Sequence, residues 1–176
     1  MSILETIKAR RSIRDYLPTP VSDDILHQLV EAAAWAPSGS NAQLWTFIVV
    51  RKRENVHKLK ILSPGIIGEP AAMIVICRDQ ERAKQLGIEG AESVSAWMGD
   101  GMAAQNIMLL AYELGIGSCA VRSFHPRVVQ ILLDLPAWIE PQLIVLLGYP
   151  TKGPPIPYKR SLEEMTHWEQ FTRSNP

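Results

Sequence analysis

The chain has 176 residues, the size of one ordinary domain. Its 18 Lys and Arg residues balance 18 Asp and Glu residues, and this zero formal charge argues against a protein that depends on long-range attraction to nucleic acid or anionic membranes. Hydrophobic residues make up 47% and charged residues 20% of the composition, which excludes disorder as the global state. A net charge near zero also favours self-association.

Neither the cysteines nor the apolar segments indicate a secreted or membrane protein. Cys77 and Cys119 lie far apart and form no disulfide framework, a usage typical of the reducing cytoplasm, so we expect a cytoplasmic protein. No apolar run approaches the roughly 18 residues of a membrane span, and residues 1–11 lack the cleavage site of a secretory signal. Because no repeat, low-complexity run or linker divides the chain, we expect one domain over residues 1–176.

The first elements predicted are two helices with clear start signals. Ser2 and Glu5 have the spacing of a capping box, and the helix that they begin should end near Arg11. After a rigid connector that contains two prolines, Ser22 can cap a second helix, which the Pro- and Gly-containing segment 37–41 ends.

Beyond residue 41, buried strands alternate with helices. Four short segments rich in β-branched and other apolar residues are predicted to be strands: 46–50, 71–77, 118–121 and 142–147. Shorter helices are expected at 54–62, at 81–86 and from Pro126 onward. The proline-rich segment 150–157 should be extended, and Ser161 and Glu164 repeat the capping-box spacing for a final short helix.

The segment 93–114 is predicted to be one long helix that is apolar on nearly every face. At 1.5 Å per residue such a helix spans about 30 Å, roughly the width of a domain of this size. A helix of this kind is buried on every side, either within its own fold or against a second subunit.

The strongest local candidate for a binding site is the segment RRSIRDY, residues 10–16. Arg10, Ser12 and Arg14 place two guanidinium groups and a hydroxyl close together, and these groups can hold a phosphate through charge-assisted, bidentate hydrogen bonds. Taken alone, the same cations could instead complement the dipole at the C-terminus of the first helix.

Two further loops carry polar or small residues beside a predicted strand. The segment 36–45 offers small and amide side chains as donors and acceptors, although turn formation alone also explains it. In the segment 114–124, Gly115 and Gly117 would let the backbone approach a flat ligand closely. They do not form a dinucleotide-binding fingerprint, because they follow a helix and lack the third glycine.

The side chains typical of metal sites or nucleophilic catalysis are not arranged for either purpose. The histidines have no metal-ligand spacing with one another or with the cysteines, so we expect no metal site from His27, His57, His125 and His167. There is no G-x-S-x-G elbow or P-loop, and no residue stands out as a catalytic nucleophile or general base. If the protein is an enzyme, a cofactor supplies the reaction.

The chain resembles the FMN-dependent nitroreductase family in four segments, which share its order and spacing: RRSIRDY (10–16), LVEAAAWAPSGSNAQLWTFIVV (29–50), AAQNIMLLAYELGIGS (103–118) and GYPTKGPPIPYKRSLEEMTHW (148–168). The likeness covers nearly the whole chain. It implies an α+β fold, a three-layer α/β/α domain with a mostly antiparallel central sheet, in an intertwined homodimer. FMN would lie in the subunit interface, where the long apolar helix packs against its mate.

The resemblance also implies which residues hold FMN. Arg10 and Ser12 match phosphate ligands, and Arg11 contributes through its backbone. Arg14 matches the cation beside flavin N1 and O2, where the charge of the reduced flavin accumulates. The remaining matches are a basic pair that closes on the phosphate (Lys159, Arg160), a loop that reaches the flavin of the other subunit (Pro37, Ser38, Ser40, Asn41, Gln43) and a strand end whose main chain faces flavin N5 (Val121, Arg122, Ser123).

The implied activity is ping-pong hydride transfer from NADH or NADPH, through flavin N5, to flat acceptors such as nitroaromatics, quinones or activated alkenes. No side chain takes a catalytic role, because the chemistry occurs at the flavin. Arg122 and Ser123 stand where the family commonly has a glycine, which makes the surface near N5 bulkier and more cationic. The alternatives are a specialised flavin enzyme of the same fold (a reductive dehalogenase or a flavin-fragmenting enzyme), a non-catalytic flavin-binding protein, and an anion-binding module without flavin.

Overall fold

The computed structural model describes residues 2–88 and 94–171 of the chain. The helices in these residues are α1 (Ile3–Ala9), α2 (Asp23–Ala34), η1 (Gly39–Asn41, a short 3-10 helix), α3 (Arg53–Ile61), α4 (Gln80–Gln85), α5 (Val94–Glu113), α6 (Pro126–Leu132) and α7 (Leu162–Met165). The strands are β1 (Trp45–Val50), β2 (Ala72–Asp79), β3 (Gly117–Val121) and β4 (Ile139–Gly148). The helix caps predicted at Ser2, Ser22 and Ser161 are confirmed.

The strands form one antiparallel sheet in the order β1-β2-β4-β3. The central strands β2 and β4 are buried along most of their length, which explains why both contain nearly continuous apolar runs. β4 begins at Ile139, earlier than the predicted start at residue 142. Pro141 cannot donate to a strand ladder, and the structure accommodates it opposite Cys77, next to a shift in the pairing register.

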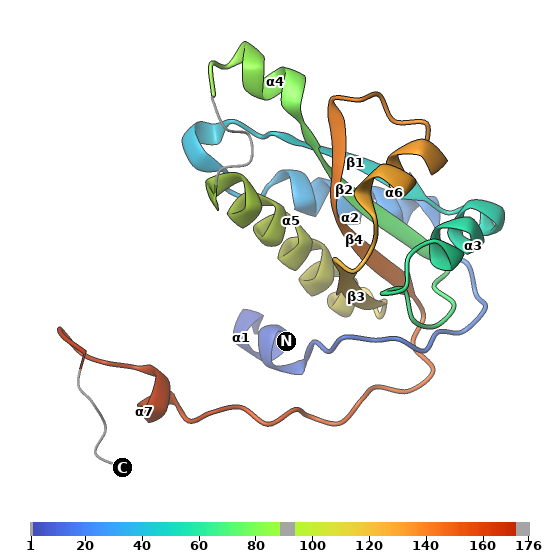
Figure 1. Ribbon diagram of the computed structural model, residues 1–176. Coiled ribbons are helices and arrows are strands. Elements are labelled where there is room, and N and C mark those ends of the chain that lie inside the picture. The colour runs from blue at the N-terminus through green and yellow to red at the C-terminus, as the bar shows by residue number, and fades with distance from the viewer. Residues whose placement is uncertain (1, 89–93, 172–176) are drawn as a thin grey trace.

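Helices cover both faces of the sheet and make it the middle of three layers (Figure 1). Successive residues of β2 point to opposite faces of the sheet and so belong to two different apolar cores. Ile74 lies in the core under α2 and α5, whereas Val75 lies in the core under α3 and α6. The three-layer α+β architecture expected from the resemblance is therefore confirmed.

α5 is buried on one side and exposes apolar side chains on another. Ala103, Ile107 and Ala111 are completely buried in the core beneath it. Met98 and Met102 are 56% and 37% exposed. The chain's own fold therefore buries only part of the apolar surface that the sequence gives this helix.

The segment after α1 lies beside the edge strand β3. Ser12 forms a parallel bridge with Ser118, and the Ile13 N–H donates to the Ser118 carbonyl at 2.9 Å. Gly117 permits this approach, because a Cβ atom there would lie 2.8 Å from Ile13 Cγ2. The buried Tyr16 hydroxyl donates to the Ile13 carbonyl at 2.5 Å. The arginine-rich segment is thus fixed along one edge of the sheet.

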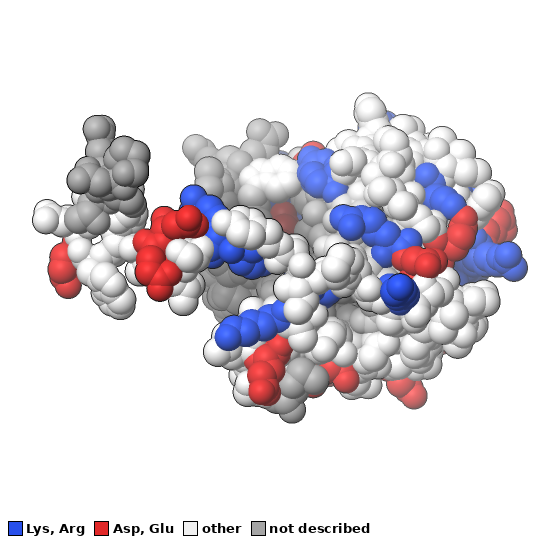
Figure 2. Space-filling view, turned by 90° about the horizontal axis from the view of Figure 1, so that it is seen from below, with Lys and Arg blue, Asp and Glu red and all other residues white. Residues whose placement is uncertain are grey.

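The chain leaves the folded body after β4. From Pro150 an extended arm runs past the body to α7 (Figure 1). Tyr158 and Trp168 on this arm are 84% and 83% exposed. The first turn of α7 contains Glu163 and Glu164, and Figure 2 shows acidic side chains on the arm. Neither aromatic side chain belongs to the apolar cores of the folded body.

Candidate functional site

The arginine-rich segment forms a basic cradle at the end of α1. Arg10 is the C-cap residue of this helix, and its backbone N–H donates to the Thr6 carbonyl at 2.9 Å. The Arg10 Nη1 atom is buried and has no hydrogen-bond partner among the described residues. Buried polar groups in folded proteins are nearly always hydrogen-bonded, so this atom indicates an anion that the cradle is built to bind.

A pocket of about 410 Å³ opens beside the cradle. Arg10, Arg11 and Ser118 line one part of it, and Ile156 from the arm lines another. The Arg11 side chain donates to the carbonyls of Lys8 and Arg10 at 2.6 and 2.8 Å, which ties its guanidinium to the end of α1. Cationic and apolar walls together suit the phosphate ester of an organic molecule.

Arg14 lies further along the same segment and points to the surface. Ile13 and Tyr16 on either side of it are buried in the core, so the backbone that carries Arg14 is fixed. Burial raises the pKa of Tyr16, and its phenol therefore stays neutral and serves as a structural donor.

The loop between α2 and β1 has a backbone that non-glycine residues rarely adopt. Ser40, Asn41 and Gln43 have φ values of 50°, 53° and 49°, in the left-handed region. The loop is held in this shape from outside, because Arg82 Nε donates to the Ala42 carbonyl at 2.7 Å. Left-handed backbone costs about 1–2 kcal/mol per residue, and such strain is concentrated at functional sites.

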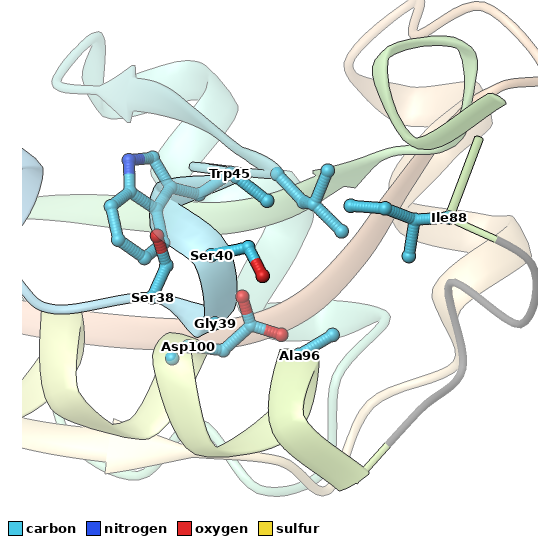
Figure 3. Close-up of a pocket in the computed structure, with 10 residues that line it drawn as sticks. Ser38, Gly39, Ser40, Trp45, Ile88, Ala96 and Asp100 are labelled. Carbon is cyan, nitrogen blue, oxygen red and sulfur yellow. The ribbon is translucent and has the colours of Figure 1, made fainter. Parts of the chain in front are cut away.

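A second pocket, of about 160 Å³, lies where this loop meets α5 (Figure 3). The Ser40 hydroxyl and the Asp100 carboxylate point toward the same part of this pocket, and Trp45 and Ile88 also line it. Asp100 forms a buried ion pair with Arg78 at 2.8 Å. Burial raises the pKa of Asp100, and the Arg78 guanidinium opposes that rise. The pocket therefore gains little net charge from Asp100.

The end of β3 carries the third set of predicted site residues. Val121 is buried, whereas Arg122 and Ser123 are exposed. The Gly65 N–H donates to the Ser123 carbonyl at 2.9 Å, and a Cβ atom on Gly65 would lie 2.7 Å from Ser123 Cβ. Glycine at position 65 thus lets a neighbouring loop hold this strand end at the surface.

The cradle and this strand end lie along one edge of the sheet. Ser12 is bridged to Ser118 at the start of β3, and Arg122 follows Ser118 by four residues. At 3.3 Å per residue, the strand covers about 13 Å between them. One chain therefore brings together the predicted phosphate residues and the predicted flavin-facing main chain.

The strained loop lies apart from the cradle. The pocket at the loop is lined by Asp100 and the pocket at the cradle by Tyr112. These two residues are separated by about 18 Å along the axis of α5. Lys159 and Arg160 lie on the exposed arm just before α7.

Two contacts at the site have no counterpart among the sequence predictions. Arg78 follows the apolar run of β2, and Asp100 interrupts an apolar helix. A buried charge is normally paired, but the sequence does not show which residue is its partner. The Arg122 guanidinium carbon lies 5.1 Å from the ring centroid of Trp97, a residue that the sequence shows only as one of several scattered aromatics.

The described residues contain neither a metal cluster nor a membrane helix. Among residues 2–88 and 94–171, no three His, Cys, Asp or Glu side chains are grouped to hold a metal ion. In the same ranges, no helix combines the length and the apolar character needed to cross a membrane. Cys77 and Cys119 are both buried and free.

These features define a class of protein: an α+β sandwich with a basic cradle at one sheet edge, in which one guanidinium nitrogen is buried, and a strained polar loop at a distance from it. The model of the nitroreductase family matches residues 7–63 and 55–149. A protein of Methanothermobacter thermautotrophicus is 33% identical over 161 residues, which cover 88% of this chain and 80% of that protein. A protein of Bacillus subtilis named as an NAD(P)H-using FMN reductase is 30% identical, over 96% of this chain and 75% of its own.

Solved structures share the fold. A nitroreductase family protein of Clostridium difficile 630 superposes with a TM-score of 0.83 at 27% identity, covering 97% of this chain and 100% of that one. An FMN-dependent nitroreductase of Clostridium difficile R20291 gives a TM-score of 0.81 at 25% identity, over 96% and 99% of the two chains. The chain belongs to the nitroreductase family.

Proposed function

We propose that this member of the nitroreductase family is an FMN-dependent oxidoreductase that takes electrons from NADH or NADPH and passes them to a flat acceptor. The oxidoreductase activity follows from the family and from relatives in Bacillus subtilis and Vibrio harveyi, named as an FMN reductase and an NADPH-flavin oxidoreductase. The observation that carries the cofactor assignment is the buried Nη1 atom of Arg10, which has no partner among the described residues and lies beside a pocket with room for a phosphate ester.

The cradle supplies the anchor for the phosphate. Arg10 and Ser12 would bind its oxygens directly, and Arg11 would contribute its backbone, since its guanidinium is already tied to α1. Lys159 and Arg160 would close on the same phosphate from the arm.

The ring system of FMN would lie along β3. The strand covers about 13 Å from the cradle to Arg122, a length that an extended FMN can follow. The main chain of Val121, Arg122 and Ser123 would then face flavin N5. Arg14, exposed on the neighbouring segment, would place positive charge near N1 and O2 and stabilise the reduced form.

The chemistry that bound FMN supplies is ping-pong hydride transfer between the reduced nicotinamide and an acceptor, for which nitroaromatics, quinones and activated alkenes are the expected classes. The chain itself binds and orients these molecules, excludes water and provides fixed charge. No side chain needs to act as a general acid or base.

A homodimer would complete the site. An apolar groove of about 490 Å³ is lined by Ile3, Trp35, Leu109 and Leu110, and Trp35 is 80% exposed. If α5 packs antiparallel to its mate about a two-fold axis, the strained loop of the partner comes next to this chain's cradle, because loop and cradle lie toward opposite ends of the helix. Ser38, Ser40 and their neighbours would then contact the partner's flavin.

We further propose that residues 1–176 form one FMN-binding domain that works in the cytoplasm. Both apolar cores share the same sheet, which supports a single folding unit. The free, buried cysteines fit a reducing compartment.

The proposed function is tested with purified protein and FMN. We expect one FMN per chain, rapid bleaching of the bound flavin by NADH or NADPH without oxygen, and recovery of its colour when menadione is added. Arg10→Ala should weaken FMN binding by about tenfold or more, because it removes a charge-assisted hydrogen bond. Arg53→Ala, an exposed arginine at the start of α3, is the matched control and should bind FMN normally.

Two outcomes would contradict the proposal. Bound flavin that neither nicotinamide reduces would make the protein a non-catalytic flavin-binding protein. A colourless protein that does not take up FMN, yet binds inorganic phosphate through Arg10, would make it an anion-binding module.

A further inference from the structure

We propose that Arg122 binds an anionic group of the acceptor, so that the protein prefers flat acceptors that carry a carboxylate over neutral acceptors of the same shape. This inference rests on the proposed function, which places Arg122 beside the face where the acceptor is reduced. It adds a substrate class and the residue that selects it.

The backbone around Arg122 is held from two directions. The Phe124 N–H donates to the Arg122 carbonyl at 2.9 Å, which makes a tight turn directly after β3. The Ser123 carbonyl accepts a hydrogen bond from Gly65, also at 2.9 Å. The Arg122 side chain therefore starts from a fixed point at the end of the strand.

The side chain of Arg122 is held as well. Its guanidinium carbon lies 5.1 Å from the ring centroid of Trp97 and 5.3 Å from that of Phe124. Aromatic rings attract a guanidinium through its charge and leave its N–H donors available for other partners. An arginine ordered in this way loses less side-chain entropy when it binds a ligand than a mobile surface arginine does.

Trp97 is itself braced from the protein interior. The Arg78 guanidinium carbon lies 5.0 Å from the Trp97 ring centroid, and Arg78 is fixed by its buried ion pair with Asp100 at 2.8 Å. A series of contacts thus connects the buried Asp100, through Arg78 and Trp97, to Arg122 at the surface. Trp97 is a positioning residue in this arrangement, and the residue is 41% exposed.

The charge of Arg122 is not compensated within the described part of the chain. The ion pairs found there are Arg51–Asp23, Lys58–Glu54, Lys60–Glu69 and Arg78–Asp100. The carboxylate on the inner side of Trp97 is therefore already paired with Arg78. An ordered, exposed and unpaired guanidinium favours an anion at this point.

A carboxylate on the acceptor fits the position of Arg122 best. Arg122 belongs to the strand end that would face flavin N5, so its guanidinium lies within one side chain of the reacting atoms. A planar carboxylate on an aromatic ring can accept two hydrogen bonds from a guanidinium while the ring remains over the flavin. The phosphates of a nicotinamide donor are separated from its reacting ring by at least one ribose, which places them farther away.

The test uses the FMN-loaded protein and two ligands that differ mainly in charge, 4-nitrobenzoate and 4-nitrobenzamide. Their dissociation constants are measured without an electron donor, from the change in flavin absorbance, so that no turnover takes place. We expect 4-nitrobenzoate to bind about tenfold more tightly, as for one charge-assisted interaction at an exposed site. Added salt should reduce this preference, because it screens exposed charges.

Variants at three positions test whether Arg122 is the source of this preference. Arg122→Met should abolish the preference, and Arg122→Lys should retain part of it. Arg127→Met removes the same charge from an exposed arginine of α6, whose Nη1 donates to Gln130 Oε1 at 2.6 Å, and should leave the preference intact. If Arg122→Met does not take up FMN, Trp97→Leu provides the second measurement and should weaken the preference by loosening Arg122.

Equal binding of the two ligands by the unaltered protein would overturn the proposal, as would an unchanged preference in Arg122→Met. A variant that loses affinity only for NADH or NADPH would assign Arg122 to the donor's phosphates and would also overturn it. Reduction of the bound flavin by a nicotinamide, measured in the same samples, tests the proposed function separately. A flavin that is bound and reduced without any charge preference leaves that function standing and removes only this inference.

Discussion

At the scale of single residues, Arg78 carries a positive charge into the interior at the end of β2. Its side chain is 1% exposed and that of its partner Asp100 is 7% exposed. Burying two charges costs desolvation energy that their attraction and hydrogen bond must offset. Removing one partner leaves the other buried and uncompensated, which makes the pair far more sensitive to substitution than any surface ion pair.

Asp100→Ala should therefore lower the free energy of unfolding by about 3–5 kcal/mol. The control is Asp23→Ala, which breaks the ion pair with Arg51 at 3.1 Å, where both side chains are more than half exposed. That change should cost about 1 kcal/mol or less. Urea unfolding followed by tryptophan fluorescence measures both values, and equal losses would contradict the assignment of Arg78 and Asp100 to the interior.

Cys77 gives a second prediction at this scale. Burial raises the pKa of its thiol to about 12, so almost no thiolate exists near pH 8 in the folded protein. In a Cys119→Ala background, Cys77 should react with a thiol reagent such as DTNB only as fast as the protein unfolds. Labelling of the native protein at the rate of a free thiol would show that this strand is more open than the structure describes.

At the scale of elements, most of the fold is predictable because its signals are local. Capping boxes at Ser2 and Ser161 and β-branched runs in the strands lie within a few residues of what they specify. The start of β4 is missed because Pro141 disfavours a strand locally, and only its pairing with β2 shows how the ladder accommodates it.

The sequence predicts the candidate site only where the site residues lie within one short segment. Arg10 and Ser12 share one short stretch, and the structure fixes this stretch beside β3, where Arg10 lines a pocket and Ser12 is bridged to Ser118. The contacts of Trp97 with Arg78 and Arg122 join α5, β2 and the turn after β3, and no sequence spacing encodes them. Contacts between distant segments arise from tertiary packing, which local patterns do not reveal.

The shape of the strained loop before β1 is expected to affect the affinity for FMN. Arg82→Met removes the hydrogen bond from Nε to the Ala42 carbonyl and should let the loop relax from its left-handed conformation. If the loop contacts the flavin, the dissociation constant of FMN should rise several-fold, with only a small change in melting temperature. Arg53→Met is the control. Unchanged FMN affinity in Arg82→Met would mean that the loop's shape does not serve the flavin.

For the molecule as a whole, the fold of a single chain does not explain why so many apolar side chains remain exposed. The arm carries exposed aromatic side chains, and the groove at α1 and α5 is lined with apolar ones. Both surfaces would be covered if the arm of each copy lay across its partner. Self-association would then be part of the fold as well as of the site.

Trp168→Ser combined with Tyr158→Ser should therefore weaken the dimer without disturbing the folded body, since neither side chain is packed in a core. Sedimentation equilibrium should show a larger fraction of monomer at low concentration, and FMN should dissociate as the monomer forms. The control is Lys152→Ser, which changes the same arm but keeps both aromatic side chains and the proposed phosphate residue Lys159. A dimer of unaltered strength would show that the arm does not hold the two copies together.

In the proposed dimer, each flavin lies between the cradle of one chain and the loop of the other. Subunit complementation tests it most directly: Arg10→Ala and Ser40→Tyr chains, each deficient in FMN binding, are unfolded together, refolded as a mixture and titrated with FMN. If the site is shared, each mixed dimer carries both substitutions in one site and none in the other, so about a quarter of all sites should recover normal affinity. If the mixture binds no more FMN than the two variants do separately, cradle and loop belong to the same chain's site and the account is wrong.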